Sequence, residues 1–442
     1  MPFESGETGL PRKIAVIGGG ISGLGAAHLL SSDTRANHRV VLFEAAPELG
    51  GHARTVLAGR RGDQPVDTGF IVFNRANYPH LTALFEALDV PVAESNMSFA
   101  ASIDGGRVEY GLASLDVLFA QRRNAMRPSF LRMCRDILHF NRNGARVAAE
   151  EPQQSVGDFL DRLGTGAAFR EHYLSPFSGA IWSTPLERIL DFPAHAMMEF
   201  FRNHALLDYD GQHQWYTVRG GSREYVGRLE AALRRSGVEL RTGTPVEAVQ
   251  RGRDGAAVRM PGGEWELFDE VILATHSDIA LRLLVDASPE EAADLGAIRY
   301  QRNDAILHAD AALMPKSRKV WSSWNYTEPK GARRERIDLT YWMNSLQPIP
   351  ADDPMFLTLN TAQPIREELI YDQVRFDHPV FDLGAMGAQE RIRQRNGQNQ
   401  TWFCGAWLGN GFHEDGLASA HRMAEALHAK LRPTLRMPVA AE

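Results

Sequence analysis

Three glycines and one acid near the start of the chain have the types and spacing needed to hold a pyrophosphate and a ribose. Gly18, Gly20 and Gly23 form a G-x-G-x-x-G pattern, and Glu44 follows about 20 residues later. The first glycine permits a tight turn, the second lets a pyrophosphate approach bare backbone, and the third allows a helix to pack closely on a strand. Glu44 can accept hydrogen bonds from both ribose hydroxyls and would repel the ribose phosphate of NADP. The pattern therefore predicts a dinucleotide site that disfavours NADP.

The elements that must position these residues are visible in the same stretch. Residues 14–17 and 40–43 are short apolar runs typical of buried parallel strands, and a helical pattern begins near the last glycine. That helix would direct its free N–H groups and its positive dipole end at the phosphates. A second glycine pair, in Leu49-Gly50-Gly51-His52, follows the acid closely and favours FAD over NAD.

Composition limits the remaining possibilities. The 442 residues suffice for two or three domains, and a formal net charge of −7 with a pI near 6.1 argues against a nucleic-acid partner. Two distant cysteines, Cys134 and Cys404, form neither a disulfide framework nor a metal site. The first 13 residues have no apolar core, and no apolar run is long enough to span a bilayer. We therefore expect a cytoplasmic location without a secretory signal, with any contact to the inner membrane being peripheral.

The C-terminal part carries a second glycine-rich segment. Phe403 ends an apolar run, glycines at 405, 409, 411 and 416 shape a loop, and a helical pattern begins at Leu417. With these motifs at its two ends, the chain resembles the flavin amine oxidase and phytoene desaturase superfamily. The resemblance implies an α/β fold, in which a Rossmann-like FAD-binding domain of the amine oxidase (GR2) type is joined to an interleaved α+β substrate domain. We expect the first domain to contain residues 1–75, 216–285 and 391–442, and the second to contain residues 76–215 and 286–390.

The motifs and the resemblance together predict a non-covalent FAD site and a neighbouring substrate site, with no metal. The expected cofactor-binding residues are Gly18, Gly20, Ile21, Ser22, Gly23, Glu44, Ala45, Gly50, Gly51, His52, Thr68, Gly69, Phe70, Val246, Ala274, Gly405, Ala406, Gly416 and Leu417. The expected substrate-lining residues are Tyr78, Trp182, His308 and Trp407. His413 or Glu414, in the loop expected to face the flavin, is the candidate catalytic base. A structural role for each of these single residues stays open.

Three departures from the amine oxidases reduce the case for amine chemistry. Those enzymes have arginines around the glycine pair, where this chain has Ala46, Glu48 and His52 and only Arg54 nearby. They have an acid where this chain has Ala406. They also use a lysine that holds water against the flavin, but the corresponding stretch, residues 303–308, contains none. Amine oxidation is therefore the second hypothesis.

The whole-chain pattern is most similar to a bacterial subgroup of FAD-binding oxidoreductases associated with membrane fatty acids. Segments such as residues 66–85, 119–130 and 402–417 resemble flavoprotein desaturases that act on methylated acyl chains in furan fatty acid synthesis. The resemblance implies hydride transfer from a phospholipid acyl chain to flavin N5, proton removal by a base, and electron transfer to O2 or another acceptor. A fatty-acid double-bond isomerase, an amine oxidase and a non-enzymatic flavoprotein remain alternatives.

Two segments of the expected substrate domain have two interpretations each. Ser129 can cap a helix that extends to about Arg142, and arginines recur before it and along it. This basic stripe is either a solvated helix face or a surface for anionic lipid headgroups; its arginines are Arg122, Arg123, Arg127, Arg132, Arg135 and Arg142. Residues 156–203 form a helical region rich in Phe and Met, with Ser155 as its cap, and could be core or the wall of an acyl channel.

Coarser patterns predict the remaining elements. Residues 78–88 and 225–235 are expected to be helices, and residues 238–241, 245–249 and 269–276 strands of the FAD domain. Alternation at residues 304–309, 320–326, 338–343 and 355–360 predicts an antiparallel sheet in the substrate domain.

Overall fold

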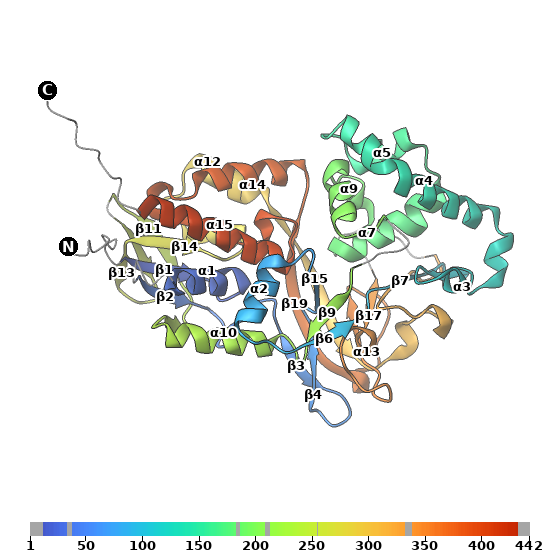
Figure 1. Ribbon diagram of the computed structural model, residues 1–442, viewed down its shortest axis with the longest axis horizontal. Coiled ribbons are helices and arrows are strands. Elements are labelled where there is room, and N and C mark those ends of the chain that lie inside the picture. Colours follow the sequence, from blue (N-terminus) through green and yellow to red (C-terminus); the bar gives the residue numbers. More distant parts are fainter. Residues whose placement is uncertain are drawn as a thin grey trace, which may run out of the picture. The chain divides into compact units, whose positions relative to one another are not determined.

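The chain passes repeatedly between two units. The computed structural model describes residues 12–32, 38–182, 186–207, 213–253, 255–331 and 338–431, so the N-terminal segment 1–11 lies outside the described residues. Unit 1 contains residues 1–51, 226–298 and 387–442, and unit 2 contains residues 52–225 and 299–386. Figure 1 shows the elements of both units along the chain.

The bounds of the two units differ from those expected for the domains. Residues 286–298 and 387–390, predicted in the substrate domain, fall in unit 1, and residues 52–75 and 216–225, predicted in the FAD-binding domain, fall in unit 2. The reason for the second difference is a three-stranded antiparallel sheet, in which β5 (Val72–Asn74) and β6 (Val92–Ser95) both pair with β9 (Trp215–Val218). Three strands that share hydrogen bonds must lie in one unit.

Unit 1 is built on a five-stranded parallel sheet. Its strand order is β10-β2-β1-β14-β20. The strands are Glu239–Arg241, Arg39–Phe43, Lys13–Ile17, Glu270–Leu273 and Thr401–Phe403. The strands predicted at residues 14–17, 40–43, 238–241 and 269–276 are therefore confirmed, with shifts at their ends. Because all five run in parallel, their carboxyl ends share one edge, which is where ligands bind in such sheets.

Two helices cross this sheet side by side. Helix α1 (Ile21–Ser32) follows β1, and α15 (His413–Leu431) follows β20 through a short loop. A Cβ on Gly416 would lie 2.8 Å from Ser22 Oγ, and a Cβ on Gly25 would contact Leu417, so small residues let the two helices approach closely. The helices are parallel, because residues 22 and 25 of one helix meet residues 416 and 417 of the other. Their N-termini therefore lie together (Figure 1).

The rest of unit 1 surrounds this sheet. An antiparallel sheet contains β11 (Ala248–Arg251), β12 (Ala256–Arg259) and β13 (Trp265–Phe268). The strand predicted at residues 245–249 is wrong in its first half, because the chain becomes a strand only at Ala248. The helices are α10 (Arg223–Arg235, from residue 226 onward), α11 (Ser277–Leu283), α12 (Pro289–Ala297) and α14 (Leu383–Arg395, from residue 387 onward).

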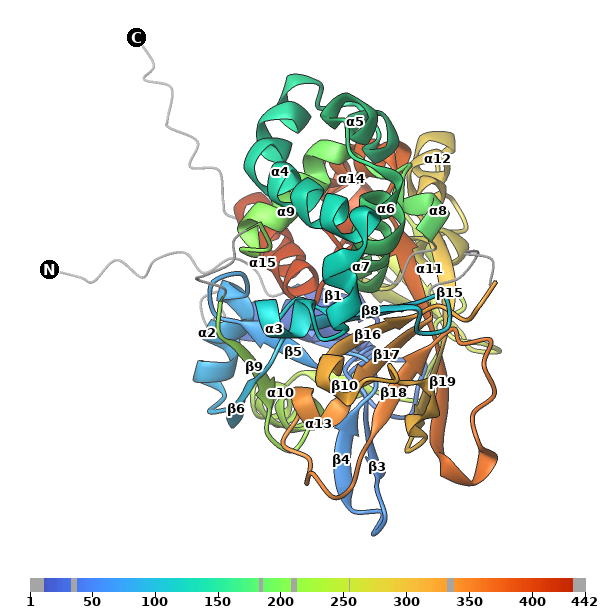
Figure 2. The ribbon, with the colours of Figure 1, turned by 90° about the vertical axis from the view of Figure 1, so that its right-hand side faces the viewer.

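Unit 2 contains a seven-stranded sheet of order β19-β15-β18-β17-β16-β7-β8. The strands are Ile370–Val380, Arg299–His308, Phe356–Leu359, Leu339–Trp342, Trp324–Thr327, Phe99–Ile103 and Val108–Gly111. The four predicted strands pair in antiparallel fashion as expected, although the one predicted at residues 320–326 begins only at Trp324, and Figure 2 shows β16, β17 and β18 side by side. Strand β19 is not among the predicted strands, and the β16–β7 pair is parallel. A small hairpin of β3 (Thr55–Ala58) and β4 (Gln64–Asp67) completes the strands of the unit.

The helical part of unit 2 lies between β8 and β9 in sequence, preceded by α2 (Pro79–Ala87). It contains α3 (Leu115–Leu118), the long α4 (Pro128–Glu150), α5 (Val156–Leu163), α6 (Ala167–Phe169), the π-helical turn Arg170–Leu174, α7 (Ser175–Trp182), α8 (Leu186–Ile189) and α9 (Ala194–Asn203). Helix α13 (Met343–Leu346) lies in the sheet region. In the described residues, no helix is both long enough and apolar enough to span a lipid bilayer.

Two capping predictions have different outcomes. Ser155 caps α5, because its hydroxyl accepts the N–H of Asp158 at 3.1 Å. The prediction that Ser129 caps α4 is wrong: Arg127 is the N-cap residue, and Pro128 occupies the first helical position. The N–H of the first helical residue has no partner within the helix. Proline suits that position because it has no N–H. The helix also continues eight residues beyond Arg142, to Glu150.

Candidate functional site

The three motif glycines have the three environments that the sequence predicts. Gly18 has a φ of +112°, and a Cβ there would lie 2.8 Å from the carbonyl oxygen of Ala274. Gly23 packs so closely that a Cβ would collide with the carbonyl oxygen of Gly18. A Cβ on Gly20, by contrast, would meet no atom within 4 Å. Gly18 and Gly23 are therefore fixed by packing, whereas the bare backbone of Gly20 faces open space at the beginning of α1.

Glu44 is held beside this loop by the backbone. One carboxylate oxygen accepts the N–H of Gly19 at 2.5 Å, and the other accepts the N–H of Ala46 at 2.8 Å. Residues 243 and 244 pair with the same segment, because Gly243 donates to the Ala46 carbonyl and Thr244 to the Glu44 carbonyl. Each carboxylate oxygen keeps acceptor capacity for a hydroxyl. Ala45 lies between these two paired residues in the chain, and the contacts of Ala45 and Val246 with FAD stay predictions.

The second glycine pair lies against the first motif. Gly50 donates its N–H to the carbonyl of Gly19 at 2.8 Å, and Gly20 and Gly50 form an isolated parallel bridge. A Cβ on Gly51, which has a φ of +58°, would lie 3.1 Å from the Cα atom of Gly20. The pair thus brings the chain close to Gly20 without side chains that would fill the open space.

The C-terminal loop is held by side chains that the sequence analysis did not identify. Ser419 accepts the N–H of Gly405 at 2.8 Å, and Gln389 donates to the carbonyls of Trp407 and Gly409. Asp415 accepts the N–H of Phe412 at 2.9 Å, and burial raises the pKa of this carboxyl to about 6. Ser419 and Asp415 could have been suspected from their places in the first turns of α15. No signal in the sequence marks Gln389, in the middle of α14.

These features satisfy the requirements for FAD. Open space beside Gly20, an acid fixed by two backbone N–H groups and two adjacent helix N-termini all lie within unit 1, at the carboxyl end of the parallel sheet. The backbone N–H groups and helix dipoles suit the pyrophosphate, and the acid suits the ribose. Gly405, Ala406, Gly416 and Leu417 lie at the second of these N-termini, beside Ile21 and Ser22.

A family model supports the same conclusion. The model described as flavin containing amine oxidoreductase matches residues 21–306, which is more than half of the chain. The chain belongs to this family. It is an FAD-dependent oxidoreductase of the amine oxidase type, and its fold is the mixed α/β fold that the sequence predicts.

Solved structures with this flavin amine oxidoreductase fold cover nearly the whole chain. A putative protoporphyrinogen oxidase from Exiguobacterium sp. 255-15 is 17% identical, with a TM-score of 0.67, and the match covers 95% of this chain and 99% of that one. A fatty acid isomerase from P. acnes that produces CLA is 15% identical, with a TM-score of 0.68 and coverages of 95% and 98%. Cyclohexylamine oxidase from Brevibacterium oxydans IH-35A is 15% identical, with a TM-score of 0.66 and coverages of 96% and 100%. No curated protein matches the sequence significantly.

Four expected cofactor-binding residues of this flavin oxidoreductase lie in unit 2. A Cβ on Gly69 would collide with the carbonyl oxygen of His52, and Phe70 donates its N–H to the same carbonyl at 2.9 Å. Thr68 accepts from Arg54 at 3.1 Å. His52 stacks on Phe376 with ring centroids 4.9 Å apart. Their contact with FAD stays a prediction.

The side chain of Arg54 forms an ion pair with Asp372. Its guanidinium binds Asp372 through two hydrogen bonds, of 2.6 and 3.0 Å, and donates to Thr68. Such a bidentate pair fixes the position of the guanidinium and neutralises much of its charge. The one arginine that follows the glycine pair is therefore a structural anchor within unit 2.

The four expected substrate-lining residues are all buried and have different neighbours. Tyr78 contacts Phe73 and Trp215. Trp182 lies among Phe192, Phe200 and Phe201, in the helical core of unit 2. Within unit 1, Trp407 donates its indole N–H to the carbonyl of Thr275 at 2.9 Å. A role for any of them in lining the substrate site stays a prediction.

His308, the fourth of these residues, is part of a buried polar chain. Its Nδ1 accepts the N–H of Asp310 at 3.0 Å, so Nε2 carries the proton and donates to Thr358 Oγ1 at 2.7 Å. Thr358 in turn bonds to Thr340 at 2.8 Å. Burial lowers the pKa of His308 to about 4, which keeps the ring neutral.

The two candidate bases lie in the first turn of α15. His413 and Glu414 are both partly exposed, as is Asp415, which follows them and caps the loop. Burial lowers the pKa of His413 to about 3. The imidazole is therefore neutral at physiological pH, but it would be a weak proton acceptor.

Four of the five lysines in the sequence bind an acidic side chain or a backbone carbonyl in the structure. In unit 1, Lys13 pairs with Glu266 and Lys430 pairs with Glu270, each at 2.9 Å. Lys13 and Glu270 begin their strands, so both ion pairs lie at the opposite edge of the sheet from the glycine motif. In unit 2, Lys319 pairs with Asp116, and Lys316 donates to the carbonyl of Gly105.

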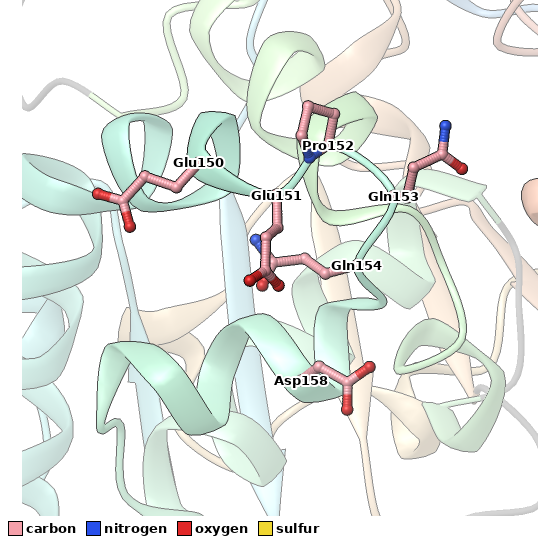
Figure 3. Close-up of a pocket in the computed structure, with 6 residues that line it drawn as sticks. All are labelled: Glu150, Glu151, Pro152, Gln153, Gln154 and Asp158. Carbon is pink, nitrogen blue, oxygen red and sulfur yellow. The ribbon is translucent and has the colours of Figure 1, made fainter.

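A pocket at the junction of α4 and α5 is a separate feature. Figure 3 shows its lining residues, which are Glu150, Glu151, Pro152, Gln153, Gln154 and Asp158. Arg162 pairs with Glu150 at 2.9 Å and with Glu151 at 3.2 Å, so much of the acidic charge is neutralised. None of the residues predicted to act in catalysis or cofactor binding lies in this pocket.

Proposed function

We propose that the protein desaturates an unsaturated, methylated acyl chain of membrane phospholipid. The observation that carries this proposal is an aromatic sheet face in unit 2. Phe99, Trp324 and Tyr341 are successive partners across β7, β16 and β17, so their side chains share one face. Phe177 of α7 packs on Phe99 with ring centroids 5.2 Å apart, and Trp324, Tyr341 and Phe177 are all partly exposed. Such a surface suits an apolar chain.

The polar groups of this face support the same class of substrate. Among the paired strand residues that the structure describes on this face, one is acidic. It is Asp372, which pairs with Leu307 of β15. Arg54 already binds Asp372. An ammonium substrate would thus find no unpaired carboxylate along these strands, whereas an acyl chain needs none.

In the proposed reaction the cofactor and the protein have different roles. FAD, when bound, accepts a hydride at N5 from an activated C–H bond and passes the electrons to O2 or another acceptor. The chain must hold the neighbouring proton acceptor, and Glu414 and His413 are the candidates. Loss of a hydride and of a proton from adjacent carbons leaves one new double bond. The backbone around Gly20, with the N-termini of α1 and α15, holds the cofactor for this step.

The test is an anaerobic titration of the FAD-loaded protein with bacterial phospholipids, followed by flavin absorbance and by analysis of the recovered acyl chains. Bleaching of the oxidised flavin together with a new conjugated diene would support desaturation. If the flavin stays oxidised and the acyl chains are unchanged, while an amine bleaches it, the proposal fails.

Two other functions share parts of this evidence. A double-bond isomerase would need the same site and would return the hydride to the same acyl chain; a fatty acid isomerase is among the proteins of similar fold. A shifted double bond, without a gain in the number of double bonds and without net bleaching, would favour it. Amine oxidation is favoured by one observation: the rings of Trp324 and Tyr341 are perpendicular, with centroids 5.5 Å apart, and aromatic faces can bind an ammonium group. Cyclohexylamine oxidase also has a similar fold.

A further inference from the structure

One surface of unit 2 combines exposed apolar side chains with a concentration of arginine. Leu115 and Met126 are 76% and 79% exposed, and Leu131 and Leu138 of α4 are 45% and 51% exposed. Seven arginines and three acids lie in residues 115–150, in a chain with a formal net charge of −7. We call the surface formed by α3, the turn Arg122–Met126 and the exposed side of α4 the docking face. Figure 1 shows this segment as one continuous stretch in teal.

Contacts within unit 2 hold the parts of this surface together. Asp116 of α3 pairs with Arg122 at 2.6 Å. The rings of Phe119 and Phe130 meet edge to face with centroids 5.8 Å apart, which ties the end of α3 to the first turn of α4. The exposed leucines and methionine therefore project from a fixed scaffold and not from a loose loop.

The order of residues on α4 is that of an interfacial helix. Leu131, Arg135, Leu138 and Arg142 are spaced by three and four residues, so they form one exposed stripe, while Phe130, Met133 and Phe140 are buried on the other side. Within the part of the chain that the structure describes, Arg142 has no ion-pair partner. A merely solvated face would not need leucine between its arginines.

Other arginines are held by backbone carbonyls. Arg127 donates to the carbonyl of Arg107 at 2.7 Å, and Arg123 donates to the same carbonyl at 3.1 Å. Burial lowers the pKa of Arg127, and the charges of Arg123 and Arg107 lower it further. Carbonyls orient these guanidinium groups without neutralising them, so a bound phosphate would relieve their mutual repulsion.

We propose that the docking face binds the surface of an anionic phospholipid bilayer. The arginines would contact lipid phosphates, and Leu115, Met126, Leu131 and Leu138 would enter the boundary between headgroups and acyl chains. Charge complementarity and the exposed apolar side chains both favour this partner over another acidic or apolar protein surface. This inference goes beyond the proposed reaction and does not depend on it.

Vesicle sedimentation of the FAD-loaded protein tests the proposal. Mixed phosphatidylcholine–phosphatidylglycerol vesicles should bind the protein, salt should weaken the binding, and pure phosphatidylcholine vesicles should bind it poorly. The pairs Met126→Ser with Leu131→Ser, and Arg123→Gln with Arg127→Gln, should each reduce the partition coefficient about tenfold or more. The matched control is Leu267→Ser with Arg282→Gln, because Leu267 is 73% exposed and the Arg282 side chain 71% exposed, both in unit 1. The control should bind like the wild type.

Several results would overturn the proposal. These are absence of wild-type binding at low salt, equal binding to both vesicle types, or equal losses in the control. A dimer that Met126→Ser with Leu131→Ser converts to a monomer, without any vesicle binding, would assign the face to a second copy of the chain instead. A thiol probe at Met126→Cys, in a Cys134→Ser background, should shift to the blue with anionic vesicles. Because binding is measured without turnover, its failure is distinct from failure of the lipid reaction.

Discussion

The carboxylate of Glu44 accepts a 2.5 Å hydrogen bond from the backbone N–H of Gly19, between the first two glycines of the nucleotide motif. The acid that would bind ribose therefore also fixes the loop that would bind pyrophosphate. The contact lies within unit 1, so the positions of the expected ribose acceptor and of the expected pyrophosphate loop are coupled to each other.

Replacement of Glu44 should weaken FAD binding more than it destabilises the fold. Glu44→Ala removes the ribose acceptor and frees the N–H groups of Gly19 and Ala46, which water can then reach. Hydrogen bonds to a charged group contribute about 1.5–3 kcal/mol, so FAD affinity should fall about tenfold to a hundredfold. Flavin fluorescence during titration of the apoprotein measures the affinity. Glu48→Ala, an exposed acid four residues later, is the control, and an equal loss there would contradict the assigned role.

The same substitution at two motif glycines should have two different effects. Gly20→Ala adds a methyl group to open space, so the apoprotein should keep its thermal stability but bind FAD at least about tenfold more weakly. Gly23→Ala forces a methyl group against the carbonyl of Gly18, and overpacking of this kind costs about 1–3 kcal/mol or more. Thermal unfolding and FAD titration of both variants separate the two roles. Normal FAD affinity in Gly20→Ala would show that the open space is not the pyrophosphate site.

The buried imidazole of His308 should make stability depend on pH. Its folded-state pKa is lowered by burial to about 4, whereas the unfolded value is near 6.5. Between these values the unfolded chain binds a proton that the folded chain does not, so the free energy of unfolding should decrease as pH falls. The slope from this residue is at most about 1.4 kcal/mol per pH unit.

Urea unfolding between pH 7 and pH 4 (approximately the interval between the two pKa values) measures this slope. His308→Gln is less stable at neutral pH but should lose less stability on acidification than the wild type. His139→Gln, at an exposed histidine, is the control. An unchanged slope in His308→Gln would mean that the ring is already protonated in the folded protein.

The local geometry of the glycine motif could be predicted from the sequence, because the type of residue at a few fixed positions determines most of it. A turn at Gly18, bare backbone at Gly20 and close packing of Gly23 on Gly18 each depend on glycine at a fixed position within six residues, although Gly18 also packs against the distant Ala274. The strands on either side are apolar runs that can be read directly. The same holds for Ser155, whose capping bond is made to a residue three positions away.

Features that depend on distant partners could not be predicted in this way. Gln389 supports the C-terminal loop only because α14 passes beside it, and nothing in its own segment indicates this. β19 alternates polar and apolar residues weakly, and its place is fixed by pairing with β15, about 70 residues earlier in the chain. Helix α4 was given the wrong cap because Ser129 is a good capping residue, but Pro128 already starts the helix.

The choice of base can be tested within the first turn of α15. Glu414→Gln keeps the shape of the side chain but removes its ability to hold a proton. If Glu414 removes the substrate proton, the rate of anaerobic flavin reduction should fall about 10²–10⁴-fold. His413→Gln should have a smaller effect, because an imidazole with a pKa of about 3 is a weak proton acceptor. FAD affinity should stay unchanged in both variants. Glu425→Gln, an exposed acid on the same helix, is the control.

The pH profile of flavin reduction distinguishes the two residues further. With its pKa lowered to about 3 by burial, His413 stays neutral above about pH 5, so it should contribute no acidic limb near pH 6.5. An acidic limb near that value that disappears in His413→Gln would assign the proton transfer to the imidazole and would show that substrate binding raises its pKa. A rate in Glu414→Gln within about twofold of the wild type would remove Glu414 from the mechanism. If both variants keep the wild-type rate, the proton acceptor must lie outside this turn.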